Sequence, residues 1–188
     1  MVSTQTPVCD FGKSAPDFFL PGVDGKNWSL RECAGPNGVL VMFICNHCPY
    51  VKAINHKLVR DASELRTLGV NSVAIMSNDT DTYPEDSFEN MKRVAEDIAY
   101  PFPYLIDATQ GVARDFGAVC TPDFFGYNAD LELQYRGRLD ESGRQADVGD
   151  VKRELFLAMK QVAETGRGPQ DQIASIGCSI KWLSGQEE

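Results

Sequence analysis

Two cysteines three residues apart, Cys45 and Cys48, form the pattern of this chain with the clearest chemistry. They follow the apolar run 39–44, which predicts a buried strand, and Pro49 opens a helical pattern. A thiol at a helix N-terminus meets unpaired N–H groups, which lower its pKa from about 8.5 to roughly 3.5–7.5. The sequence therefore predicts dithiol–disulfide exchange, with Cys45 as the attacking thiolate and Cys48 as the resolving thiol.

The elements around this pair alternate between strands and helices. A helix over about 49–68 and a strand over 70–76 complete a βαβ unit with parallel strands. An α/β fold with one central mixed sheet flanked by helices satisfies the order of all the elements. The other expected elements are an N-terminal β-hairpin around the turn 21–25, an α-β insertion (a helix begun by a capping box at 86–89, then a strand at 104–107), a short helix at 111–116, antiparallel strands at 123–127 and 131–136, and a helix over about 148–165.

Length and charge limit the possible classes of protein. The 188 residues predict one domain over 1–188, with a lead-in at 1–14 and a C-terminal tail at 166–188. The net charge of −9 excludes nucleic acid and anionic membrane as expected partners, because both repel an acidic surface.

A cytoplasmic location is expected from three features. Residues 1–10 lack the basic and apolar stretches of a secretory signal. No apolar run approaches the roughly 20 residues that span a bilayer. Six cysteines are too few for a disulfide scaffold, which favours free thiols in a reducing compartment.

Several motifs together resemble one family. A CxxC at a strand-to-helix junction, followed by the pair Thr121-Pro122 at the start of a hairpin, resembles the thioredoxin fold. The N-terminal hairpin and the α-β insertion are similar to the alkyl hydroperoxide reductase/thiol-specific antioxidant branch, and the resemblance covers roughly residues 14–183. Three segments are similar to a peroxiredoxin-like subgroup with a CxxC motif: 45–51, 83–87 and 177–182.

This resemblance implies a cis Pro122 that faces the cysteine pair, with the backbone of Thr121 offering hydrogen bonds to an extended substrate chain. A cis X–Pro bond costs only about 0.5–1 kcal/mol, so the expectation is physically reasonable. The chain departs from the peroxidase pattern, because Cys45 stands in the position of the threonine that orients peroxide when Cys48 is aligned with the peroxide-attacking thiol. Arg136 and Arg138 are the candidates for the assisting arginine.

The remaining candidate site residues each have two interpretations. His47 is either an exposed helix-start residue or a partly protonated imidazole that stabilises the Cys45 thiolate. Cys120 is either a packed strand thiol or a third thiol of the site. Cys178 is either a resolving thiol or a residue of a docked tail.

A metal site is the third possibility for the cysteine motif. Cys45, His47 and Cys48 offer soft ligands, to which Cys120 or His56 would have to be added. A structural zinc site needs four ligands, and the sequence shows no second motif that supplies the fourth. We therefore expect no metal and no other cofactor.

The sequence thus predicts an oxidoreductase that uses the Cys45/Cys48 pair on protein or small-molecule disulfides and thiols, regenerated by a thiol reductant. The first alternative is a peroxiredoxin-like peroxidase with antioxidant activity, which reduces hydroperoxides through a sulfenic acid. The second is a non-catalytic thioredoxin-fold module that binds a partner or a metal. Protein-disulfide reduction and hydroperoxide consumption distinguish the three.

Overall fold

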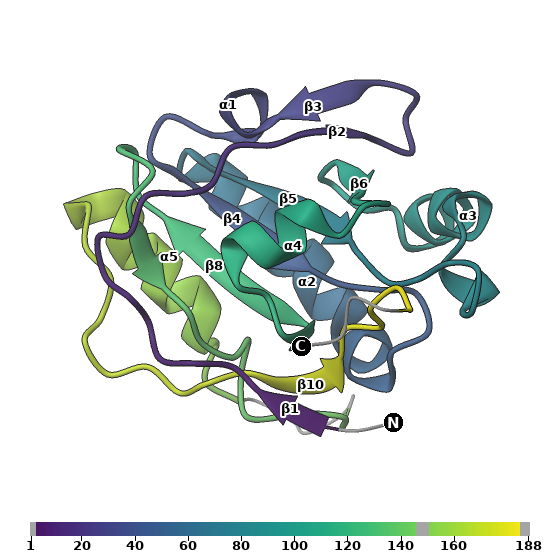
Figure 1. Cartoon of the computed structure of the whole chain (residues 1–188). Coiled ribbons are helices and arrows are strands. Elements are labelled where there is room, and N and C mark those ends of the chain that lie inside the picture. The colour runs from purple at the N-terminus through teal and green to yellow at the C-terminus, as the bar shows by residue number, and fades with distance from the viewer. Residues whose placement is uncertain (1–2, 146–150, 185–188) are drawn as a thin grey trace.

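A five-stranded mixed sheet lies at the centre of the computed structural model, which describes residues 3–145 and 151–184. The strand order is β6-β5-β4-β8-β9 (Figure 1). Strand β8 runs opposite to the other four strands, which confirms the predicted mixed sheet. The strands are β4 (Gly38–Phe43), β5 (Val70–Met76), β6 (Tyr104–Ile106), β8 (Asp123–Tyr127) and β9 (Leu133–Tyr135).

The central strand β4 forms because its residues are apolar without interruption and its two edges are both paired. It lies parallel to β5 on one side and antiparallel to β8 on the other. Every residue of β4 is buried. Helix α2 (Pro49–Thr67) connects β4 to β5 and has Pro49 in its first turn, as the sequence predicts.

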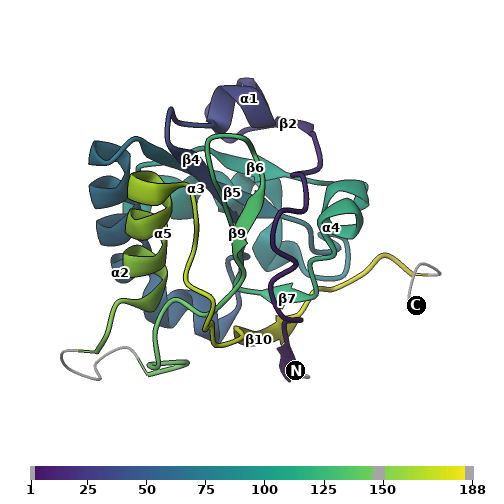
Figure 2. The same cartoon turned by 90° about the vertical axis from the view of Figure 1, so that its left-hand side faces the viewer.

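The alternating side chains of β4 separate two apolar cores. Leu40 and Met42 pack with residues of α2 and of α5 (Glu154–Thr165). Val41 and Phe43 pack with residues of α4 (Gly111–Phe116) and of the N-terminal hairpin. Figure 2 shows α2 and α5 on one side of the sheet and α4 on the other. The sheet is therefore covered on both faces, and its inner strands are buried on both.

The hairpin and the insertion are present where the sequence predicts them. The hairpin pairs β2 (Phe19–Pro21) with β3 (Asn27–Ser29), and it leads into the short helix α1 (Leu30–Cys33). The insertion contains a 3-10 turn, η1 (Pro84–Asp86), then α3 (Phe88–Ile98) and β6.

Two predicted helix starts differ from the structure. The N-cap of α3 is Ser87, whose hydroxyl accepts the N–H of Asn90; the predicted cap, Asp86, uses its carboxylate elsewhere. Helix α5 begins at Glu154, whereas the pattern predicted a start near 148. Positions 148–150 of that prediction lie outside the described residues.

A second, small sheet joins the two ends of the chain and was not predicted. It has the order β1-β10-β7 and consists of β1 (Ser3–Gln5), β10 (Ile176–Ser179) and β7 (Cys120–Thr121). Strands β1 and β10 lie side by side in Figure 1. Residues that the pattern assigned to a lead-in and a tail are therefore held beside the strand that precedes Pro122.

No helix in the described part of the chain combines the length and the apolar character needed to cross a bilayer.

Truncation of Phe43 tests the core that packs against α4. Phe43 is 1% exposed, and its ring centroid lies 5.5 Å from that of Phe116 and 5.8 Å from that of Phe125. Phe43→Ala should lower the free energy of unfolding by about 3–5 kcal/mol in urea denaturation. The matched control, Phe19→Ala, removes a ring that is 68% exposed and should change it by less than about 0.5 kcal/mol. Equal effects would contradict the assigned core.

Candidate functional site

Cys45 and Cys48 lie in the turn between β4 and α2. Cys48 is the N-cap residue of α2, and Cys45 lies two residues beyond the end of β4. The residues are 2% and 0% exposed, respectively. The two side chains shift each other's pKa.

The structure brings the Thr-Pro pair against both sulfurs. The Thr121-Pro122 bond is cis, as expected. Cys45 Sγ lies 3.4 Å from the hydroxyl of Thr121. Cys48 Sγ lies 3.1 Å from the carbonyl oxygen of the same residue. Segments more than 70 residues apart in sequence thus form one buried site.

The pKa of Cys48 is lowered and that of Cys45 is raised. The pKa of Cys48 is lowered to about 5, and the largest cause is the hydrogen bond from Cys45. Burial opposes this change, whereas Thr121, the N–H of Val51 and Cys178 lower the pKa further. The same bond, burial and the charge of Asp86 raise the pKa of Cys45 well above its usual range. The carbonyl of Thr121 favours protonated Cys48, but the donors outnumber this one acceptor.

The sequence hypothesis instead makes Cys45 the thiolate, which stays a prediction. The expectation placed Cys45 against the unpaired N–H groups of the helix. Helix α2 begins at Pro49, so Cys48 is the residue next to its first turn. Because the influence of a helix terminus falls off within one turn, the N–H groups of α2 act on Cys48 more than on Cys45.

His47 is held by Asp86, a residue that the sequence pattern predicted only as a helix cap. The Nδ1 atom of His47 lies 2.6 Å from Asp86 Oδ2 and 3.9 Å from Cys45 Sγ. Its ring stacks on that of Tyr83, with centroids 5.4 Å apart. The hydrogen bond to Asp86 raises the pKa of His47. The imidazole thus lies beside Cys45 as expected, but the Asp86 carboxylate offsets its charge there.

Asp86 is completely buried and is satisfied by four donors. Its carboxylate accepts the N–H groups of Asn46 and His47, the imidazole and the side-chain amide of Asn78. Burial would raise the pKa of Asp86, but the bonds from His47 and Asn78 hold it below its usual value. The cysteine loop is therefore fixed to η1 through one carboxylate.

Of the two candidate third thiols, Cys178 contacts the pair. Its sulfur lies 3.2 Å from Cys48 Sγ, and Cys178 is paired with Thr121 across β10 and β7. Cys120 directs its sulfur to the carbonyl of Pro122, at 3.6 Å, and burial raises its pKa. The edge of Thr121 that was expected to receive an extended substrate is occupied by β10.

Both candidate arginines are bound elsewhere. Arg136 donates to Asp123 and to the carbonyl of Gly117, and it lies over the ring of Phe125. Arg138 forms a two-bond ion pair with Glu154. Neither guanidinium has a described contact with the cysteine pair.

A metal could find three ligand atoms in this site. Those of Cys45, His47 and Asp86 lie within 4.8 Å of one another. The Nδ1 atom of His47 and the carboxylate of Asp86 already bind each other. Cys48, a ligand in the sequence hypothesis, contacts Thr121 and Cys178 instead. Three ligands, two of them mutually bonded, do not fit the four-ligand pattern of a structural zinc site.

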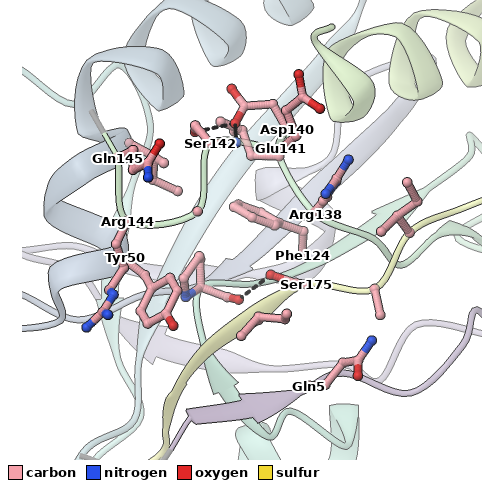
Figure 3. A pocket seen from close by; sticks show the side chains of 17 residues that line it. Gln5, Tyr50, Phe124, Arg138, Asp140, Glu141, Ser142, Arg144, Gln145 and Ser175 are labelled. Carbon is pink, nitrogen blue, oxygen red and sulfur yellow. Dashed lines mark hydrogen bonds between the residues drawn. The ribbon is translucent and has the colours of Figure 1, made fainter. Parts of the chain in front are cut away.

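A cavity of about 460 Å³ adjoins the site from the side of Pro122 (Figure 3). Tyr50, in the first turn of α2, forms one wall. Ser175 stands opposite and donates to the carbonyl of Pro122 at 2.9 Å. The residues that line the cavity do not include Cys45 or Cys48, so the two sulfurs lie outside this cavity.

Replacement of Asp86 tests the histidine–carboxylate pair. Asp86→Asn should lower the pKa of His47 toward about 6.5, because the charge partner is lost. An NMR titration of the His47 imidazole in the wild type and in the variant measures this pKa.

The same variant has a defined effect on stability. The raised pKa of His47 makes its contribution fully present below about pH 6.5 and lost as the pH rises through the folded-state pKa. Asp86→Asn should therefore lose more unfolding free energy at pH 6 than at pH 9 in urea denaturation. Equal losses at the two pH values would contradict the assigned pairing.

Comparisons with known proteins agree with this geometry. The chain is similar to an uncharacterized conserved protein from Geobacillus kaustophilus (46% identity, TM-score 0.92, 98% of each chain covered). It is also similar to a hypothetical protein from Sinorhizobium meliloti (38%, TM-score 0.90, 97% of this chain and 100% of the other). The thioredoxin domain of a thiol-disulfide oxidoreductase from Bacteroides vulgatus shares the fold at 16% identity (TM-score 0.58, 69% and 89% covered).

No curated protein matches the chain. The model of the AhpC/TSA family matches residues 11–142, which is more than half of the sequence. The thioredoxin-like fold and the family inferred from sequence are thus confirmed, and the chain belongs to the AhpC/TSA family.

Proposed function

We propose that this chain is a thiol–disulfide oxidoreductase that uses Cys45 and Cys48 as its redox pair. The observation that carries the proposal is a buried CxxC at the N-terminus of α2, with Cys45 Sγ 3.4 Å from the hydroxyl of Thr121 and Cys48 Sγ 3.1 Å from its carbonyl oxygen, beside the cis Thr121-Pro122 bond. A thiolate is the reactive form in exchange, and a pKa near 5 keeps Cys48 charged at neutral pH.

The exchange then proceeds in two steps. The Cys48 thiolate attacks a substrate disulfide, forms a mixed disulfide and releases one substrate thiolate. The sulfur of Cys45 next attacks Cys48, so that the Cys45–Cys48 disulfide forms and the second substrate sulfur leaves with the proton of Cys45. A thiol reductant returns the pair to the dithiol. These roles reverse the order expected from the sequence.

The substrates we propose are small disulfides and thiols. Both reactive residues are buried, and the strand edge at Thr121 is paired with β10. An extended polypeptide could bind that edge only after β10 had left it. A small molecule needs no strand edge, and the cavity at Tyr50 and Pro122 lies close to the pair. A reducing, cytoplasmic location suits a pair that must be returned to the dithiol.

Peroxide reduction is the second candidate, and one observation favours it. The lowered pKa falls on Cys48, the cysteine that the resemblance aligns with the peroxide-attacking thiol. Its thiolate would displace an alcohol or water from a hydroperoxide and become a sulfenic acid, which Cys45 would resolve with loss of water. A peroxidase site uses an arginine beside the reactive thiol. Arg136 and Arg138 are bound to Asp123 and Glu154 instead, which favours disulfide exchange.

A pH titration locates the thiolate. The absorbance of a thiolate at 240 nm should rise with pH through a midpoint of about 5 in the wild type, and this step should be missing in Cys48→Ser. Cys120→Ser is the control and should keep the step. A midpoint near the ordinary value of about 8.5, or a step that disappears in Cys45→Ser but persists in Cys48→Ser, would contradict the assignment.

Activity assays test the function itself. With dithiothreitol as the reductant, the wild type should reduce glutathione disulfide faster than it reduces the disulfides of insulin. Cys48→Ser should fall to the rate without protein, because no thiolate remains at the helix terminus. Cys120→Ser should keep the wild-type rate. If the protein reduces neither disulfide, the proposal is overturned. If it consumes hydrogen peroxide rapidly and Cys48→Ser does not, the second candidate replaces it.

A further inference from the structure

Strand β10 places a third sulfur against the reactive one. Cys178 is 3% exposed, and its Sγ lies 3.2 Å from that of Cys48. Sulfurs in a disulfide are about 2.05 Å apart, so a movement of about 1.2 Å would join the two. Cys48 thus has two neighbouring thiols: Cys45 from its own loop and Cys178 from the far end of the chain.

Several contacts hold β10 at this distance. A Cβ at Gly177 would collide with the carbonyl oxygen of Thr121, so only glycine permits this close approach of β10 to β7. Before the strand, Ser175 exchanges backbone and hydroxyl hydrogen bonds with Thr6. After it, the N–H of Lys181 donates to Asn78, which also binds Asp86. The position of Cys178 is therefore fixed by both flanks of the strand.

The charge of Cys48 keeps Cys178 protonated in the reduced site. Burial, followed by the hydrogen bond and the charge of Cys48, raises the pKa of Cys178 to about 12, while Lys181 lowers it. The two causes that come from Cys48 disappear once its sulfur is part of a disulfide. Oxidation of Cys48 therefore removes two of the causes that raise the pKa of Cys178, while burial remains.

We propose that Cys178 is a third redox-active thiol of this site, which exchanges with the Cys45–Cys48 disulfide to form a Cys48–Cys178 disulfide. The inference rests on the proposed function, which supplies the first disulfide. The sulfur of Cys178 attacks that of Cys48, the Cys45–Cys48 bond breaks, and the proton of Cys178 ends on Cys45. One disulfide and one thiol are present before and after, so no further oxidant is needed.

This exchange would link the oxidation of the pair to the end of the chain. The new bond would tie β10 covalently to the N-cap residue of α2 and would return Cys45 to the thiol form. The disulfide would then join Cys48 to Cys178 instead of Cys45, and Cys45 would be a free thiol beside His47. We infer two oxidised forms of the site, which differ in the partner of Cys48.

Disulfide mapping tests the inference. The protein is equilibrated with oxidised and reduced glutathione, quenched in acid, digested with trypsin and analysed by mass spectrometry without reduction. Trypsin leaves both residues of the CxxC in peptide 32–52 and Cys178 in peptide 168–181, so a Cys48–Cys178 bond joins two peptides and a Cys45–Cys48 bond does not. Fragmentation identifies the linked sulfur.

The variants separate the two proposals. The linked peptides should occur in the wild type, become the main oxidised product in Cys45→Ser and be absent in Cys178→Ser and Cys178→Ala. The Cys178 variants should still form the Cys45–Cys48 loop, which tests the proposed function on its own. Cys120→Ser should match the wild type. Thermal denaturation of each variant shows that it is folded.

Two outcomes would overturn the inference. The first is the absence of linked peptides from the wild type and from Cys45→Ser, while Cys178→Ser forms the Cys45–Cys48 loop; the proposed function would then survive. The second is a link found only in Cys45→Ser, since exchange within the intact pair is what we propose. The absence of both bonds from every variant would refute the proposed function as well.

Discussion

The buried carboxylate of Asp86 is the constraint on which the arrangement of the site depends. A buried charge is stable only when it is well hydrogen-bonded, and Asp86 has donors from the CxxC loop and from Asn78, just after β5. Asn78 also accepts the N–H of Lys181 in the C-terminal tail. The loop, the end of β5 and the tail therefore belong to one network, and the positions of Cys48 and Cys178 depend on it together.

The local part of this architecture could be predicted from the sequence. The run 39–44 is apolar throughout because β4 is buried on both faces, and the structure places β4 at residues 38–43. Helix α2 ends within one residue of its predicted limit, since its apolar spacing and Gly69 are both local signals. The resemblance added the cis bond before Pro122, which no local pattern of apolar residues indicates.

The contacts that the sequence did not reveal are those between distant segments. Strands β1 and β10 have three and four residues, too short for a periodic signal, and pair across most of the chain. Asp86 begins a pattern that fits a helix cap, but Ser87 fits that role as well and takes it. Asp86 is instead bound to the half-buried imidazole of His47, which lies 39 residues earlier in the sequence.

Cys48 shows how such distant contacts change the meaning of a local motif. From the sequence, a CxxC at a strand-to-helix junction has one thiolate and one resolving thiol, and the helix terminus favours the thiolate. In the structure the helix begins one residue after the second cysteine, and the hydrogen bond from Cys45 lowers the pKa of the Cys48 sulfur although burial opposes this. That sulfur is separated from solvent by β7 and β10, which occupy the edge that an extended substrate would need. At this position Cys48 contacts Thr121 and Cys178, so the tail strand borders the motif on the side that an extended substrate would use.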